Sequence, residues 1–226
     1  MEKKSPLSSL PLSVALIISA ALIYFGLSNI KHTQSSVHVR GQAEQPVVAD
    51  RGSWTLSFQT SALTQTDAIA KSTKNKEKVI TFLTEQGFSS QDMTLASPRI
   101  EAPYSGRPEW YVHHSVILSS TSEKIRTVAS SAHKLLELGV ALSSWEAPAY
   151  EFTQLTQIKN VLISQATLEA KKAADQFAKD SGQTIGKIIT ATQGYVSFQG
   201  NVESLPEASQ INKVARVVVN IQYELK

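Results

Sequence analysis

The residues from Pro11 to Ile30 form a run of twenty without a single charge, PLSVALIISAALIYFGLSNI. Twenty residues of helix measure about 30 Å, which is the thickness of the hydrocarbon core of a bilayer. Lys3 and Lys4 precede the run, and this order favours a cytoplasmic N-terminus and export of the residues after the run. We therefore expect residues 11–30 to be a transmembrane anchor or uncleaved signal.

A cleaved signal peptide is the alternative for this run. Such a peptide normally has a shorter apolar core and a cleavage site of the form small-x-small. Gly26-Leu27-Ser28 matches that form weakly, and no A-x-A is present, so we prefer the uncleaved anchor. Both alternatives place the rest of the chain outside the cytoplasm. Residues 1–10 are then the cytoplasmic N-terminus, 31–36 a polar tether and 37–226 the exported domain.

The charge of the exported part is close to neutral. The chain of 226 residues carries a net charge of +3, but Lys3, Lys4 and Lys31 flank the apolar run. From Ser36 onward there are 19 basic and 18 acidic residues. A neutral domain lacks the positive surface that phosphate backbones require, so we expect no nucleic-acid partner. The chain has no cysteine, which excludes disulfides, thiolate metal sites and cysteine catalysis.

Hydrophobic periodicity predicts an α+β fold with largely antiparallel sheets and about three amphipathic helices. Alternation predicts strands before residue 41 and over 54–62, joined by a turn, and a closing strand over 215–223. Helical spacing predicts helices over 64–86, from Ser120 to about 138, and over 155–180. Each helix is followed by a glycine that ends it, and Ser120 and Glu123 have the spacing of a capping box. In the third helix, the predicted buried stripe is Ile158, Leu162, Ala166, Ala170, Ala173 and Phe177.

The residues that could carry chemistry do not form a recognisable constellation. Asp50 lacks a partner that the sequence can name, and we interpret it as bonding local backbone at a turn. His113 and His114 are adjacent on a strand and must face opposite sides, so they cannot share a metal. The other histidines, His32, His38 and His133, lack metal-ligand spacing.

Three short motifs have structural interpretations that we prefer. Ser131 and Lys134 match S-x-x-K without its companion motifs, and we interpret them as helix surface. GQTIGK at 182–187 has the wrong glycine spacing for a phosphate loop and comes after a helix instead of a strand. KSTKNKEK at 71–78 could contact anionic lipid or an acidic partner, but a solvated helix face explains it more simply.

The aromatic pair Trp110 and Tyr111 has two interpretations. These residues could lie in a recognition loop, but Trp110 fits better at the start of a strand with its ring in the core. The sequence therefore predicts no catalytic, cofactor-binding or metal-binding residues, and no cofactor.

Several segments resemble the SIMPL-domain (DUF541) family, which includes periplasmic 26-kDa immunogenic antigens and oxidative-stress defence proteins. Val39, Gly41, Ala43 and Glu44 resemble the start of its first strand, and Ala49, Asp50 and Trp54 resemble the entry to the second. YEFTQLTQIK at 150–159, AADQFAKDSGQTIGKI at 173–188 and ARVVVNIQYEL at 215–225 are similar to a membrane-anchored subgroup. Arg51-Gly52 departs from that subgroup, which has two apolar residues there.

The resemblance implies an envelope protein without an assigned reaction, and some members form rings or channels. We expect a protein that acts without catalysis, by self-assembly or binding, with a part in envelope stress defence. The expected partners are further copies of the chain, the inner membrane and an envelope protein. The expected location is the bacterial inner membrane, single-pass, with the C-terminal domain in the periplasm. The alternative is a periplasmic module that binds a small molecule or protein, or a secreted soluble form after cleavage.

Overall fold

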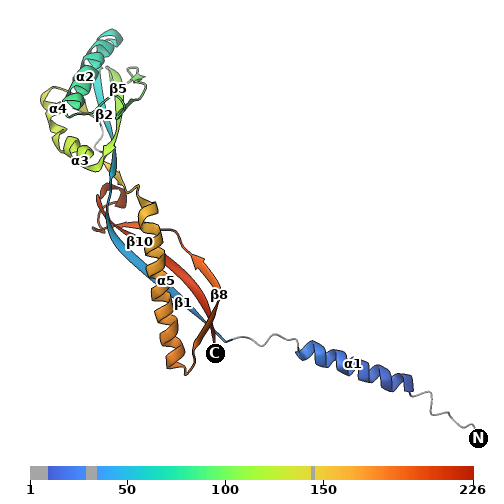
Figure 1. Cartoon of the computed structure of the whole chain (residues 1–226). Helices are drawn as coiled ribbons and strands as arrows, with labels where there is room; N and C mark the ends of the chain where they lie inside the picture. The colour runs from blue at the N-terminus through green and yellow to red at the C-terminus, as the bar shows by residue number, and fades with distance from the viewer. Residues whose placement is uncertain (1–9, 29–34, 144–145) are drawn as a thin grey trace, which may run out of the picture.

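The computed structural model of the chain describes residues 10–28, 35–143 and 146–226 (Figure 1). Its first helix is α1, Leu10–Ser28. Within the described ranges, no helix was found to have both the length and the apolar character needed to cross a membrane. The expected anchor at 11–30 therefore stays a prediction from the sequence. Residues 1–9 and 31–34, which hold most of the expected cytoplasmic segment and tether, lie outside the described residues, as does His32.

The described residues from Ser35 onward form two lobes, each an antiparallel sheet with helices packed on it. The first, which we call the α5 lobe, contains β1 (Ser36–Val48), β10 (Asn212–Leu225), β8 (Ile185–Gln193) and β9 (Ser197–Gly200) in an antiparallel sheet. The helix α5 (Leu155–Asp180) packs on one face of this sheet (Figure 1). In β10, the alternating residues from Ala215 to Tyr223 are buried beneath it, as their period of two predicted.

The second lobe, which we call the α2 lobe, contains a six-stranded antiparallel sheet in which β5 and β2 are central. Its strands are β2 (Arg51–Ala62), β3 (Met93–Leu95), β4 (Arg99–Glu101), β5 (Trp110–Thr121), β6 (Ala141–Leu142) and β7 (Ala149–Glu151). Its helices are α2 (Gln65–Glu85), α3 (Ser122–Ser131) and α4 (His133–Glu137). Phe58, Leu83 and Val116 are among the residues of the core between helices and sheet. The fold class is thus α+β with antiparallel sheets, as predicted.

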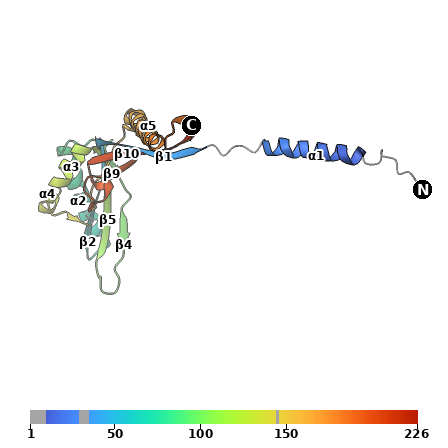
Figure 2. The same ribbon diagram turned by 90° about the horizontal axis from the view of Figure 1, so that it is seen from below.

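The first two strands do not pair with each other, contrary to the expectation of a strand pair joined by a turn. β1 pairs with β10 over its whole length, and β2 pairs with β5 over its whole length. The chain therefore passes from the α5 lobe to the α2 lobe at Ala49 and Asp50 (Figures 1 and 2). Gly41 and Pro46, which fall in the stretch between the two expected strands, lie inside β1, and Gly52, in the same stretch, lies inside β2.

Gly41 lies at a close approach of α5 to the sheet. A Cβ atom built on Gly41 would lie 1.9 Å from the carbonyl oxygen of Ala166 and 2.6 Å from the amide nitrogen of Ala170. The facing residues of α5 are alanines, which allow a helix backbone to come this near. The glycine in β1 and the alanines in α5 are thus two halves of one contact.

The helices differ from prediction in three details. Ser120 belongs to β5, and the residue before α3 is Thr121, whose side chain makes no capping hydrogen bond, so the capping box is wrong. The second helix is broken at Ala132 into α3 and α4. The buried stripe of α5 continues through Ala174 and Ala178, so Phe177 is 60% exposed instead of buried. The glycines at the ends of the helices, Gly87, Gly139 and Gly182, have positive φ, as helix-ending glycines do.

Candidate functional site

A groove of about 850 Å³ lies where the two lobes meet. The connection from β1 to β2, residues 48–50, contributes one wall, the start of α3 another, and the loop from β9 to β10 a third. This loop, residues 201–211, contains the short 3-10 helix η2 (Glu207–Ser209). We call this the junction groove, and its lining residues are Val48, Ala49, Asp50, Thr121, Ser122, Glu123, Arg126, Tyr150, Asn201, Val202, Leu205, Ser209, Gln210, Ile211 and Asn212.

Asp50 fastens the connection between β1 and β2 to the segment before α5. Its Oδ1 accepts the N–H of Thr153 at 2.7 Å, and its Oδ2 accepts the Thr153 hydroxyl at 2.5 Å. Its own N–H donates to Glu151 O at 3.1 Å, and its carbonyl accepts from the N–H of Ser122 at 3.2 Å. Partial burial opposes ionisation, but the hydrogen bonds from Thr153 outweigh it and lower the pKa of Asp50. The interpretation as a structural residue fits these bonds, although the partner is distant in sequence instead of local.

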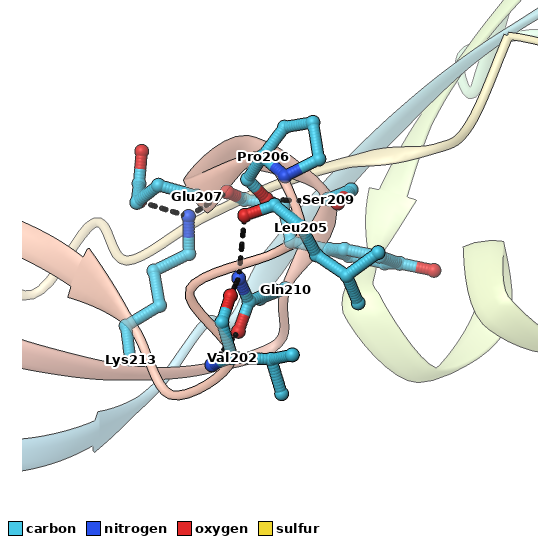
Figure 3. A network of polar contacts seen from close by, with 8 residues as sticks. Val202, Leu205, Pro206, Glu207, Ser209, Gln210 and Lys213 are labelled. Atoms are coloured by element: carbon cyan, nitrogen blue, oxygen red, sulfur yellow. Dashed lines mark hydrogen bonds and ion pairs between the residues drawn. The ribbon is translucent and has the colours of Figure 1, made fainter.

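Gln210 gives the β9–β10 loop its shape (Figure 3). Its side-chain amide donates to Val202 O at 2.8 Å and Leu205 O at 3.0 Å, and its oxygen accepts from the Val202 N–H at 2.9 Å. The side chain is nearly enclosed, and the loop folds around it. Val202 and Leu205 are then left 47% and 53% exposed on the groove wall.

Lys213 ties the same loop to the α2 lobe. Its side chain is 3% exposed, and its ammonium donates to the carbonyl of Tyr150 at 2.7 Å and pairs with Glu207 (Figure 3). A buried ammonium needs such partners, because removing one leaves an uncompensated charge. Neither Lys213 nor Gln210 was singled out from the sequence. Lys213 lies on the inward face of β10, but its position at the start of the strand gives no sign of a specific partner.

The start of α3 brings a buried hydroxyl and an exposed cation to the groove. Ser122 is 5% exposed, and its hydroxyl has no hydrogen-bond partner within the described part of the chain. Arg126, one turn further on, is exposed, and its charge opposes the effect of burial, which raises the pKa of Tyr150. Together with exposed apolar side chains, these groups suit the binding of a ligand with a polar and an apolar part.

His113 and His114 lie on opposite faces of β5, as their adjacency in a strand predicted. The Nε2 atom of His114 contacts the Ser72 hydroxyl, and its ring stacks on Phe58 at 5.2 Å between centroids. Burial, with the nearby charge of Lys76, lowers the pKa of His114. His113 faces the other side of the sheet, with Nε2 3.5 Å from a carboxylate oxygen of Glu101.

The remaining histidines also lie outside any cluster. His38 is exposed on β1, and His133 is exposed with its Nδ1 3.1 Å from Ser130 O. Among the described residues, no group of three or more His, Asp or Glu side chains could hold a metal ion.

The other short motifs considered in the sequence lie in ordinary helix, turn and strand positions. The Ser131 hydroxyl donates to Val128 O at 3.1 Å within α3, and Lys134 is exposed on α4. In the segment GQTIGK, Gly182 ends α5 and Ile185 begins β8, so no phosphate loop forms. Trp110 begins β5 and packs, partly buried, beside Ala62 and Ala68, as the core interpretation predicted. The guanidinium of Arg107 lies 3.6 Å above the ring of Tyr111.

Comparison with known proteins assigns the chain to a family whose function is unknown. A search of curated proteins found no match. The family model SIMPL, described as a protein of unknown function (DUF541), matches residues 37–223. The match spans both lobes, from the second residue of β1 to Tyr223 near the end of β10. The chain therefore belongs to the SIMPL (DUF541) family.

Proposed function

We propose that the chain is a membrane-anchored envelope protein that acts without catalysis, by self-assembly through the sheet of the α5 lobe. The observation that carries this proposal is the open outer strands of that sheet. The order β1-β10-β8 leaves the outer edge of β1, thirteen residues long, without a partner strand in the described part of the chain. Open edges are places where another chain can add a strand.

The opposite edge of this sheet, formed by β8, exposes apolar side chains. α5 covers β1 and β10, but β8 lies beyond it and is exposed along most of its length. Ile188 is 53% exposed, Ile189 is 43% exposed, and Phe177 at the nearby end of α5 is 60% exposed. A second copy that paired with this edge would bury these side chains and satisfy the backbone groups of β8.

The anchor and the compartment belong to the same proposal. Their support is the uncharged sequence from Pro11 to Ile30 with Lys3 and Lys4 before it. The expected topology places residues 37–226 in the periplasm. A reporter that is active only in the periplasm, fused after Lys226, should be active, and the protein should stay in the membrane after alkaline extraction. A part in stress defence is carried over from the resemblance alone.

Light scattering on residues 33–226 tests self-assembly. We expect a defined multimer that survives dilution. Ile189→Lys places a charge on the β8 edge and should convert this multimer to monomer. Leu168→Lys is the matched control, because Leu168 is 53% exposed on α5, and the multimer should persist. A wild-type monomer at all concentrations, with the full chain also monomeric in detergent, would refute self-assembly.

The junction groove favours a second candidate, a module that binds a small molecule or an envelope protein. Its volume of about 850 Å³ lies within the range of ligand sites, and it combines apolar side chains with Arg126 and the hydroxyl of Ser122. A thermal-shift screen with wild type and Arg126→Gln tests this candidate. A ligand that stabilises wild type but not the variant would support it, and a full screen without a stabilising ligand would count against it.

A further inference from the structure

A second groove, of about 410 Å³, lies in the α2 lobe between α2 and the edge of β2. One wall is formed by α2, and the rest comes from the end of β2 and from the residues before and in β6. The lining residues are Gln59, Thr60, Ser61, Lys71, Lys74, Asn75, Lys78, Gly139 and Ala141. We call this the lysine groove.

The charge that lines this groove has a single sign. Lys71, Lys74 and Lys78 are spaced by three and four residues, so they lie along one side of α2. The lining contains no aspartate or glutamate. Lys78 is fixed in place, because its ammonium donates to Leu138 O at 2.7 Å. Lys71 and Lys74 have no ion pair within the described residues, and both are exposed.

The edge of β2 adds backbone groups to the groove. β6 pairs with β2 only at Phe58 and Gln59, and in the described ranges no strand covers residues 60–62 on this side of β2. The carbonyl of Ser57 points to this side, since it accepts the N–H of Ser143 at 2.9 Å. Backbone groups alternate along an antiparallel strand, so Ser61 directs its N–H to the same side. The Thr60 hydroxyl is occupied, because it accepts from Asn75 at 3.0 Å.

We propose that the lysine groove binds a small soluble ligand through a phosphate or sulfate group. Such a group has enough oxygens to accept from two ammonium groups and a backbone N–H at once, and its charge complements the lysines. The volume suits a small ligand, and no carboxylate in the lining competes with the anion. This site lies in the α2 lobe and is independent of the proposed assembly through the α5 lobe.

Isothermal titration of the full chain in a neutral detergent tests the proposal, with inorganic pyrophosphate and inorganic sulfate as probes. Lys71→Gln with Lys74→Gln should weaken binding about tenfold, which corresponds to two exposed charge contacts. Lys159→Gln with Lys171→Gln is the matched control. It removes the same charge from exposed positions of α5 and should leave affinity unchanged. Raising salt from about 0.15 M to about 1 M should weaken wild-type binding more than that of the groove variant.

Three outcomes would overturn the proposal. One is no binding of either probe by the wild-type chain. Another is equal weakening in the groove variant and the α5 control, which would mean attraction to overall charge. The third is a groove-dependent association with phosphatidylglycerol vesicles without binding of the soluble probes, which would assign the lysines to a membrane surface. The circular dichroism of each variant must match wild type, so that a loss of affinity is not a loss of fold.

Discussion

Replacing Gly41 with alanine places a methyl group in the contact between β1 and α5. The new Cβ would lie 1.9 Å from Ala166 O, 2.6 Å from Ala170 N and 2.8 Å from Ala170 Cβ. These are atoms of the helix backbone and of a Cβ, so no side-chain rotation can make room. An ordinary contact of about 3.5 Å requires α5 and β1 to separate by about 1.5 Å.

The free-energy cost depends on the packing that this separation disturbs. A gap of about 0.5–1 Å already removes a quarter to a half of the attraction between facing atoms. The residues that would lose contact include Leu162, Ala166 and Ala174, each fully buried. Overpacking typically costs about 1–3 kcal/mol, and the rigid obstacle places Gly41→Ala at the upper end, about 3 kcal/mol. For a domain of this size, the melting temperature should fall by about 6–12 °C.

Thermal unfolding of residues 33–226, followed by circular dichroism at one protein concentration, measures this change. Gly186→Ala is the matched control, because the nearest atom to its new Cβ is the carboxylate oxygen of Glu224 at 2.7 Å, at the end of a flexible side chain. The control should melt within about 2 °C of wild type. If Gly41→Ala melts as wild type does, or higher, the close approach of α5 to β1 is refuted.

Three further predictions concern the junction and the α2 lobe. Asp50→Asn should lower the free energy of unfolding at pH 7 by about 1–2 kcal/mol. Because the native pKa of Asp50 is lowered, its contribution is present above the ordinary value and lost as the pH falls below it, so urea midpoints of wild type and variant should converge in acid. A constant difference down to the lowest pH would contradict this. The pKa of His114 is lowered too, so acidification below the ordinary histidine pKa should destabilise wild type more than the variant His114→Phe. Urea titrations of both proteins at pH 7 and pH 5 measure this difference. Equal losses of stability in the two proteins would contradict the prediction. Lys213→Ala leaves Tyr150 O and Glu207 without their cation and should cost about 3 kcal/mol in urea unfolding, while Lys187→Ala, exposed on β8, should cost less than about 0.5 kcal/mol.

Local patterns predicted the elements of this fold well, because the buried face of a strand or helix produces a regular spacing of apolar residues along the sequence. The inward face of β2 from Trp54 to Ala62 and the bounds of α5 both agree with periodicity. The residues of a strand do not indicate which other strand it pairs with. β1 pairs with β10, at the opposite end of the chain, so the passage between lobes at Asp50 could not be distinguished from a hairpin turn.

The candidate sites were harder to predict for the same reason. Asp50 and Thr153 are 103 residues apart, and Lys213 meets Tyr150 from 63 residues away. Such contacts depend on how the lobes pack against each other, and no short sequence motif predicts them. The lysines at 71–78 were visible as a charged stretch, but the groove depends on β6 beginning only at Ala141, opposite Gln59. The exposure of Phe177 shows a smaller limit, since a helix face can shift by one residue along a long helix.

The ladder between β1 and β10 also determines how the domain would respond to mechanical force. The chain ends beside the place where β1 begins, with the N–H of Leu225 donating to Ser35 O at 2.8 Å (Figure 1). A pull between residue 35 and the C-terminus would open the thirteen residue pairs from one end, one after another. A pull between residue 35 and Asn212, where β10 begins at the opposite end of the ladder, would instead load all of them together, in shear. The same hydrogen bonds would then resist weakly in the first direction and strongly in the second.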